Sequence, residues 1–295
     1  MISLVRKLAL IVNPVAGGGR PARALPGVQA ALREKGLEQR FEYTKSLEHA
    51  RELAVEAAAN GEVAVAFGGD GLIGAVAGAL KHTDGVVGIL PGGRGNDLCR
   101  ALGIPRGPVA ACSVLATGVV HEFDLGQAGD RTFAGIASCG FDSVANRIAN
   151  ETRVVRGGLV YAYALVRALP AWKPAHFEVT LDDGETSDFT GYSVAAANSS
   201  MFGGGMRLAP DASLQDGLLD VVMIEDMPRL RYLGLAPTVF VGRHVRRRAV
   251  RVVRTRELHI SSNRPFTLYA DGDPIAELPV TVRVLPAAVR MIVPA

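Results

Sequence analysis

Residues 63–71 have the sequence VAVAFGGDG, an apolar run that ends in a glycine-rich loop holding one aspartate. A short apolar run bounded by glycine is typical of a strand that is buried on both faces. Two further stretches follow the same plan, LALIVNPVAGGG at 8–19 and VVGILPGGRGND at 86–97. Because the carboxyl ends of parallel strands meet at one edge of a sheet, we expect the three loops to lie together there.

Helix-like segments separate these strands in the first part of the chain. They cover 22–35, 47–59, 72–80, 96–101 and 109–117, and a further strand-like segment covers 39–43. This alternation of strand and helix predicts a parallel sheet with helices packed on its faces.

After residue 119 the pattern changes to short alternating segments typical of strands. The predicted strands are 133–138, 175–181, 192–197, 218–224, 250–260, 267–270 and 280–285, with helices near 158–169 and 229–243. We therefore expect two domains, an α/β domain over 1–125 and a β-rich domain over 126–286. The last strand-like segment, at about 287–295, is free to return to the first domain.

The composition sets limits on the class of protein. The chain has 295 residues, 48% of them apolar and 21% charged, which is enough apolar material for a buried core. It has neither a run of about 18 apolar residues nor a signal peptide with a cleavage site, so we expect no membrane-spanning helix and no export. Three cysteines without metal spacing suit a reducing, cytoplasmic compartment.

The charge is small overall but unevenly spread. A net charge of +3 does not by itself predict nucleic-acid binding. Seven arginines nevertheless fall within fourteen residues: Arg243, Arg246, Arg247, Arg248, Arg251, Arg254 and Arg256. Such a cluster forms either a solvated face or a contact with anionic lipid headgroups, and the sequence leaves both open.

The three glycine loops have the chemistry of a phosphate site. Glycine lets the backbone approach a phosphate closely and point its N–H groups at it, and a following helix N-terminus adds partial positive charge. Neither the Walker A pattern nor the GxGxxG dinucleotide fingerprint is present, so a nucleotide site here must be of another kind.

Three carboxylates follow predicted strands: Asp70 inside a loop, Asp97 at a helix start and Asp124 at a strand end. Asp97 also suits a helix N-terminus and Asp124 suits a turn, whereas Asp70, between glycines, has no packing role. Converging carboxylates are typical ligands of Mg²⁺, and Mg²⁺ beside phosphates indicates phosphoryl transfer.

These loops carry a resemblance to a known family. FGGDG at 67–71, NPVAGGG at 13–19 and GGRGNDLCRALGIP at 92–105 resemble the diacylglycerol kinase catalytic family, which includes bacterial lipid kinases and sphingosine kinases. Ala209-Pro210, LQDGLLD at 214–220 and Asp271-Gly272-Asp273 are similar to its later motifs. The resemblance implies an N-terminal α/β nucleotide-binding domain, as in NAD kinases and diacylglycerol kinases, and a C-terminal β-sandwich.

The same resemblance implies an ATP- and Mg²⁺-dependent enzyme that transfers the γ-phosphate to a lipid hydroxyl, with diacylglycerol first among the acceptors. The lipid would be reached by peripheral contact at the inner face of the membrane. Dimers are common in the family, and the resemblance leaves a homodimer open.

The resemblance also implies roles for single residues. The ATP site would be lined by Asn13, Gly17, Gly18, Gly69, Gly71, Gly93 and Asn96, with Arg94 either at a phosphate or solvated. Asp70, Asp97 and Asp124 would form a water-linked Mg²⁺ network. A second, structural Mg²⁺ would take the Asp216 carboxylate and the backbone carbonyls of Ser213 and Leu218. The proton acceptor would be Asp273, as in bacterial members, or Asp70, as in sphingosine kinases.

Two alternative functions remain open, and two of the departures from the family pattern keep a loss of turnover among them. Gly74-Ala75 replaces a usual Asn-Glu pair, and Asp273 is one methylene shorter than the usual Glu. One alternative is an enzyme like NAD kinase, which shares the GGDG loop but lacks the 13–19 loop in this form. The other is a nucleotide- or lipid-binding protein that has lost turnover.

Overall fold

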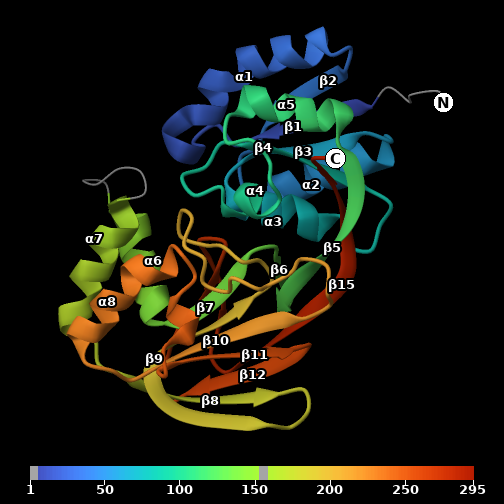
Figure 1. The fold of residues 1–295 in the computed structure, drawn as a ribbon. Helices are drawn as coiled ribbons and strands as arrows, with labels where there is room; N and C mark the ends of the chain where they lie inside the picture. The colour runs from blue at the N-terminus through green and yellow to red at the C-terminus, as the bar shows by residue number, and fades with distance from the viewer. Residues whose placement is uncertain (1–5, 153–158) are drawn as a thin grey trace. The chain divides into compact units, whose positions relative to one another are not determined.

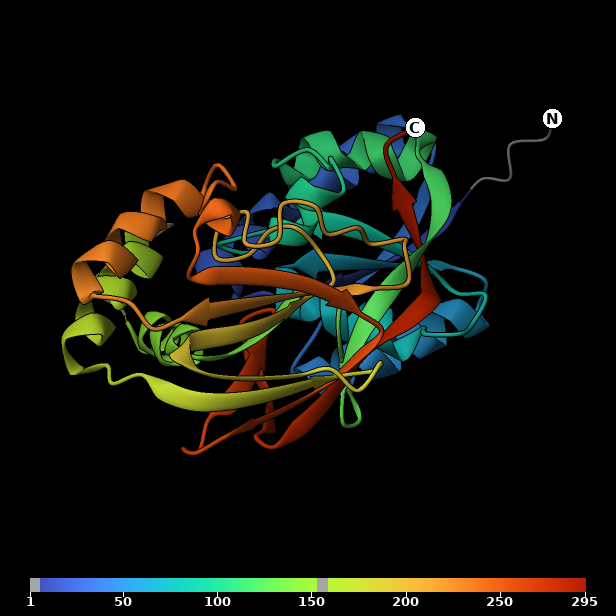
Figure 2. The same cartoon turned by 60° about the horizontal axis from the view of Figure 1, so that its bottom comes forward.

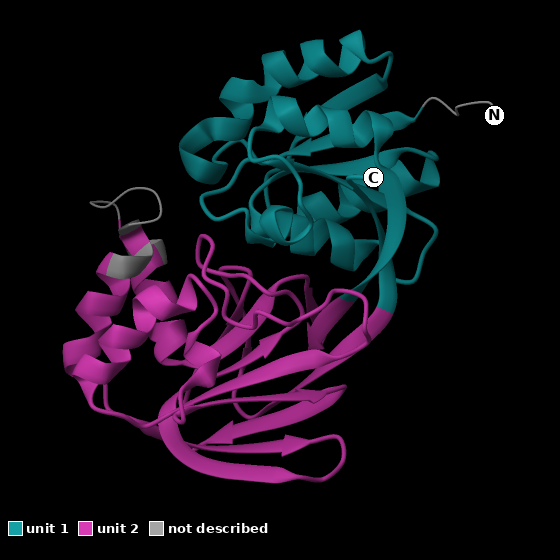
Figure 3. Ribbon diagram, viewed as in Figure 1, with its two compact units in different colours: residues 1–124, 287–295 teal, residues 125–286 magenta. Residues whose placement is uncertain are grey.

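The computed structural model describes residues 6–152 and 159–295 and divides the chain into two compact units. Unit 1 comprises Met1–Asp124 and Ala287–Ala295, and unit 2 comprises Leu125–Pro286 (Figure 3). The chain passes from one unit to the other within two strands, once in β5 (Val119–Ala128) and once in β15 (Val280–Val293).

Unit 1 is a parallel sheet with helices on both faces (Figure 1). Its strands lie in the order β15-β4-β3-β1-β2. The bounds are β1 Lys7–Val12, β2 Glu38–Tyr43, β3 Val63–Gly68 and β4 Val86–Pro91. The helices α1 (Ala16–Glu34) and α5 (Pro108–Thr117) pack on one face, and α2 (Leu47–Ala59) and α3 (Asp70–Ala79) on the other; α4 covers Asp97–Ala101.

The sequence of unit 1 explains this layering. All six residues of β3 are buried, as expected for a central strand covered by helices on both sides. The alanine-rich α2 presents Ala50, Leu53, Ala54 and Ala57 to the sheet, and the Ser46 side chain caps its first turn. The C-terminal strand β15 closes the sheet, where Arg290 and Met291 pair in parallel with Val86 and Val87 of β4.

Unit 2 is built from antiparallel strands. They lie in the order β14-β13-β7-β9-β8-β12-β15, β10 joins β9 to β11, and β6 forms a hairpin with β5. The bounds are β6 Arg131–Phe133, β7 Ile136–Gly140, β8 Ala175–Leu181, β9 Thr186–Ala197, β10 Leu219–Glu225, β11 Val250–Thr255, β12 Glu257–Ser262, β13 Thr267–Ala270 and β14 Asp273–Glu277.

The helices of unit 2 gather at one side of its strands in both views (Figures 1 and 2). They are α6 (Phe141–Glu151), α7 (Leu159–Ala168) and α8 (Arg229–Val239), with the short 3-10 helices η1 (Leu169–Ala171) and η2 (His244–Arg246). An aromatic cluster of Phe141, Trp172, Tyr192 and Tyr232 packs α6 and α8 onto β9, and the Tyr192 and Tyr232 rings stack at 3.9 Å.

Two strand predictions are wrong in detail. The predicted strand over 133–138 is divided between β6 and β7, because Asp271 takes the N–H groups of Ala134 and Gly135. The predicted strand over 250–260 is divided at Arg256, whose N–H donates to the Asp182 carboxylate instead of a neighbouring strand.

Candidate active site

The three glycine loops of unit 1 touch one another through their backbones. A β-carbon placed on Gly17 would lie 2.4 Å from the carbonyl oxygen of Gly92. One placed on Gly93 would lie 2.5 Å from the Cα of Gly69. Both distances are below any real contact of a side chain, and Gly17 also has a φ of +54°. Glycine at these positions is therefore required for the loops to meet at the edge of the sheet, as the sequence predicts.

Polar side chains hold the third loop in shape. Asn96 has a φ of +51°, and its Oδ1 accepts the Gly93 N–H at 2.8 Å while its Nδ2 donates to the Gly93 carbonyl at 3.1 Å. The Arg20 guanidinium donates to the same carbonyl at 2.9 Å. In the first loop, Asn13 Oδ1 accepts the Val15 N–H at 3.1 Å. Both asparagines therefore act on the backbone of the loops.

The remaining residues predicted for the nucleotide lie at the surface of these loops. Gly18 has a φ of +72°, and its carbonyl accepts the Arg23 guanidinium at 2.8 Å. Gly71 is half-buried in the first turn of α3. Arg94 is exposed, and its guanidinium makes no hydrogen bond or ion pair within residues 6–152 and 159–295.

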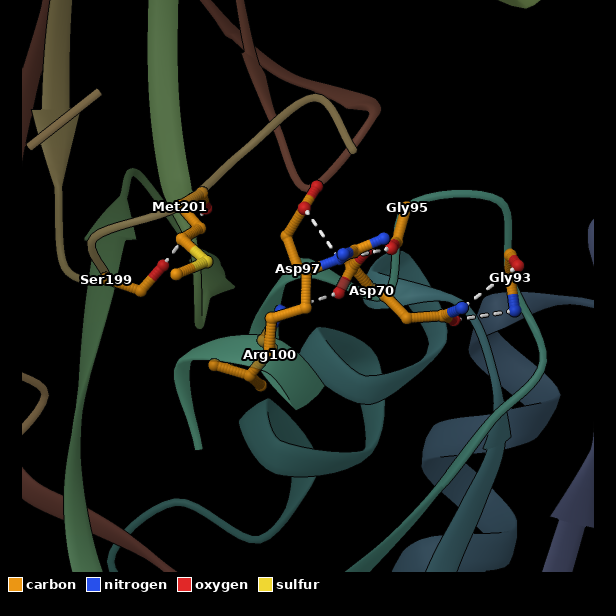
Figure 4. A network of polar contacts seen from close by, with 9 residues as sticks. Asp70, Gly93, Gly95, Asp97, Arg100, Ser199 and Met201 are labelled. Carbon is orange, nitrogen blue, oxygen red and sulfur yellow. Dashed lines mark hydrogen bonds and ion pairs between the residues drawn. The ribbon is translucent and has the colours of Figure 1, made fainter. Parts of the chain in front are cut away.

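Asp70 and Asp97 converge on Gly95 (Figure 4). A β-carbon on Gly95 would lie 2.8 Å from Asp97 Oδ2 and 3.3 Å from Asp70 Oδ2. Asp70 begins α3, and its Oδ1 accepts the Leu98 N–H at 3.0 Å. Burial raises the pKa of Asp70, and the backbone N–H groups around it oppose that rise. Asp97 begins α4, where Arg100 Nε lies 3.7 Å from its Oδ1.

Asp124, the third carboxylate of the predicted Mg²⁺ network, lies in β5. It is 3% exposed, and its Oδ1 accepts the Ala287 N–H of β15 at 2.7 Å. Among the described residues, no three His, Cys, Asp or Glu side chains are grouped so that they could hold a metal directly. The convergent carboxylates of Asp70 and Asp97 suit Mg²⁺, which prefers oxygen ligands and keeps several waters when bound.

The predicted proton acceptor, Asp273, is the first residue of β14 in unit 2. It is half-buried, and burial raises its pKa while the charge of Arg131 opposes the rise. Its turn is anchored by Asp271, whose φ is +53° and whose carboxylate accepts the N–H groups of Ala134 and Gly135 at 2.9 and 3.0 Å. Asp271 thereby positions the backbone that carries Asp273.

The segment predicted for a second Mg²⁺ is a turn before β10. Asp216 Oδ1 accepts the Leu218 N–H at 3.1 Å, and Ser213 Oγ accepts the Gln215 N–H at 3.2 Å. Asp220, which follows in β10, is 2% exposed, and Arg254 Nε lies 3.3 Å from its Oδ1. Burial raises the pKa of Asp220, and Arg254 opposes the rise.

Two arginines of this site have no role in the sequence-based prediction. Arg20 directly follows the three glycines of the first loop, and Arg100 lies one helical turn after Asp97. Arg100 Nε also donates to the Gly95 carbonyl at 3.2 Å. Two sequence patterns indicate such cations: a basic residue at the end of a glycine loop, and a basic residue three positions after a carboxylate on a helix.

Comparison with known proteins agrees with these motifs. Residues 7–128 match the model of the diacylglycerol kinase catalytic domain, and residues 135–293 match that of the YegS C-terminal NAD kinase beta sandwich-like domain. A diacylglycerol kinase of Mycobacterium tuberculosis strain H37Rv is 33% identical over 299 residues, which cover 98% of this chain and 96% of the relative.

Two further likenesses cover nearly the same span. A "Probable lipid kinase YegS-like" protein of Xanthomonas euvesicatoria is 31% identical, with 89% of each chain covered. A solved structure described as a diacylglycerol kinase of Bacillus anthracis strain Sterne aligns with a TM-score of 0.76 at 20% identity, over 99% of this chain and 98% of that one; it supports the fold. The two domain models and the full-length relatives together show that this chain belongs to the diacylglycerol kinase family of lipid kinases, phosphotransferases with an alcohol acceptor.

Proposed function

We propose that this chain is an ATP- and Mg²⁺-dependent lipid kinase that transfers the γ-phosphate of ATP to the hydroxyl of diacylglycerol. The observation that carries the proposal is the meeting of the glycine loops beside the paired carboxylates of Asp70 and Asp97. Phosphoryl transfer depends mainly on positioning phosphates and on offsetting their charge, and this arrangement supplies the groups for both tasks.

In this proposal the glycine loops hold the phosphates of ATP. Gly17, Gly18, Gly69 and Gly71 have no side chain between their backbone N–H groups and a bound phosphate. Gly93, whose own N–H is taken by Asn96, would line the site by letting the third loop lie against the second. Asn13 and Asn96 keep the loops in shape, and Arg94 is exposed and available to offset phosphate charge.

Asp70 and Asp97, with Asp124 acting through water, would hold Mg²⁺. The ion would offset the negative charge that develops on the transferred phosphate. Asp216, with the carbonyls of Ser213 and Leu218, would hold the second, structural ion. Gly74 and Ala75 are buried in α3 and offer no additional carboxylate.

We assign proton removal from the lipid hydroxyl to Asp273. The carboxylate of Asp70 receives N–H groups from the α4 backbone, which stabilise its charged form and occupy its lone pairs. The Asp273 carboxylate receives no such hydrogen bond among the described residues, so its lone pairs stay open to the hydroxyl proton.

The lipid acceptor places the enzyme at a membrane surface. No helix in the described part of the chain is both long and apolar enough to cross a bilayer. We propose peripheral binding at the cytoplasmic face.

The first experiment measures transfer from γ-labelled ATP to diacylglycerol, sphingosine, phosphatidylglycerol and a polyprenol in mixed micelles, with and without Mg²⁺, and to NAD in solution. Labelled phosphatidic acid that requires Mg²⁺ and disappears with Asp70→Asn supports the proposal. Labelled NADP would instead identify an NAD kinase. Bound ATP with no labelled product would identify a protein that has lost turnover.

A second experiment tests the assignment of Asp273. Asp273→Asn should lower kcat by about a hundredfold or more and leave ATP binding unchanged, because general bases typically contribute that much. Asp273→Glu keeps a carboxylate and should keep activity, with the acid limb of the pH–rate profile still present. An Asp273→Asn enzyme with normal kcat would move the role to Asp70.

A further inference from the structure

The end of α8 and the turn after it expose apolar side chains on unit 2. Phe240 is 53% exposed and Val241 is 61% exposed, and the two are adjacent in the chain. Single exposed apolar residues are ordinary on protein surfaces. This pair stands out because the fold holds it outward and because exposed arginines follow it directly in the chain.

The turn is tightly anchored to unit 2. Gly242 has a φ of +69°, its N–H donates to the Val239 carbonyl at 3.1 Å, and a β-carbon there would lie 2.7 Å from Pro210. His244 is fully buried, with its Nε2 2.9 Å from the Leu208 carbonyl oxygen. On the inner face of α8, Tyr232, Leu235 and Val239 are buried. Phe240 and Val241 therefore project from a fixed base.

The arginines of this region fall into two groups. Arg251 donates to Ser187, and Arg254 is paired with Asp220, so these two are bound within unit 2. The guanidiniums of Arg243, Arg246, Arg247 and Arg248 are exposed and make no side-chain hydrogen bond or ion pair in the part of the chain that the structure describes. These four arginines thus follow the apolar pair within the nine residues 240–248.

We infer that residues 240–248, the docking turn, seat the chain on an anionic lipid bilayer. Phe240 and Val241 enter the boundary between headgroups and acyl chains, and the four arginines bind lipid phosphates. An exposed apolar pair followed by four exposed arginines complements that boundary in both polarity and charge. Two apolar side chains are too few for the buried area of a stable protein interface, which disfavours a second copy of the chain as the occupant.

The inference rests on the proposed function only in that a lipid acceptor brings the enzyme to a bilayer. The docking turn itself is argued from its own exposure and charge. Binding to the bilayer and turnover are therefore measured separately.

The test compares flotation of the full chain with vesicles of phosphatidylcholine alone and with vesicles that also contain phosphatidylglycerol. Replacing Arg246, Arg247 and Arg248 with Gln should weaken binding to the anionic vesicles by roughly a hundredfold. The matched control replaces Arg33, Lys35 and Arg106 with Gln, which removes three exposed charges from unit 1, and should bind nearly as the wild type.

The apolar pair is tested in the same way. Phe240→Ser with Val241→Ser should lower vesicle affinity at least about tenfold, whereas Val55→Ser with Val109→Ser, exposed on α2 and α5, should not. Phe240→Trp adds an exposed reporter to a chain whose one tryptophan, Trp172, is 4% exposed. Its emission should shift to the blue on anionic vesicles and be quenched by brominated acyl chains.

Turnover on a short-chain diacylglycerol in detergent micelles separates the two proposals. Docking-turn variants that lose vesicle binding and keep this turnover support both. A wild type that phosphorylates no lipid while the Phe240→Trp reporter still inserts would remove the proposed function and keep the docking turn. Variants that bind vesicles like the wild type, or a Phe240→Trp emission that changes with protein concentration alone, would overturn the inference.

Discussion

At the first turn of α6, the carboxyl group of Asp142 is held inside unit 2. Its Oδ2 atom is shielded from solvent and has no hydrogen-bond partner among the described residues, while Ser193 hydrogen-bonds to the group. Burial raises the pKa of Asp142 to about 6. Burial also raises the pKa values of Cys139 and Tyr232, and the charge of Asp142 adds to both rises. A buried carboxylate of this kind costs stability whenever it is ionised.

This predicts a pH-dependent effect of Asp142→Asn. Between the ordinary pKa of 3.8 and about 6, the folded chain holds a proton that the unfolded chain releases, so Asp142 makes stability fall as pH rises through that window. Asn removes the ionisation and should raise the free energy of unfolding by up to about 3 kcal/mol at pH 7 and above, and by little below pH 4.

The measurement is urea unfolding of both chains from pH 4 to pH 8. Asp130→Asn, on an exposed turn, is the matched control. A stability difference that does not change with pH would show that Asp142 does not titrate in this range.

At the residue scale, the sequence predicts which side chains lie near one another. It is less informative about the individual contacts that each side chain makes. Asp70 and Asp97 come together because each begins a helix after a glycine loop that follows a strand of the same parallel sheet. Asp124 could not be assigned in this way, because its partner, the Ala287 N–H, lies 163 residues further along the chain. The sequence shows Asp271 only as part of a motif, because its bonds to Ala134 and Gly135 depend on a pairing between distant strands.

The glycine loops are the elements whose local sequence is most informative. Short apolar strands followed by glycine predict the parallel sheet of unit 1, because each strand and its loop are set by adjacent residues. In unit 2 the break at Arg256 was missed, because it depends on Asp182, which accepts from Thr255 and Arg256 across 73 and 74 residues of sequence. Apolar alternation continues through that break and gives no local sign of it.

The loop contacts predict a large effect of Gly93→Ala. The new methyl group would meet the Cα of Gly69 at 2.5 Å, so the second and third loops must separate. We expect a loss of about 1–3 kcal/mol in stability and a larger loss of ATP binding, because the loops no longer meet. Calorimetric titration with ATP and thermal unfolding measure the two effects.

Gly234→Ala in α8 is the control for that change. A β-carbon at Gly234 meets no atom within 4 Å, and alanine favours a helix, so stability should stay or rise slightly. Gly93→Ala with normal ATP affinity would contradict the assignment of the loops to the nucleotide.

On the scale of the whole molecule, unit 1 is assembled from both ends of the chain. Its main part ends at Asp124, and it is completed, after the whole of unit 2, by Ala287–Ala295. These last residues supply buried apolar side chains beside β4, namely Val289, Met291, Ile292 and Val293. They also pair with the backbone elsewhere in unit 1, since the Ala288 carbonyl accepts the His82 N–H at 2.7 Å.

Removing residues 287–295 should therefore unfold unit 1, although the deletion touches none of the residues proposed to bind ATP. Each buried side chain of this kind contributes about 1.5–3 kcal/mol, and four of them together approach the full stability of an ordinary domain. The Asp124 carboxylate would also lose its N–H partner.

We expect the shortened chain to lose ATP-dependent thermal stabilisation. Removing only Pro294 and Ala295, which are exposed, should leave it intact. If the chain ending at Pro286 unfolded at the wild-type temperature with ATP protection retained, the C-terminal strand would have no structural part in unit 1.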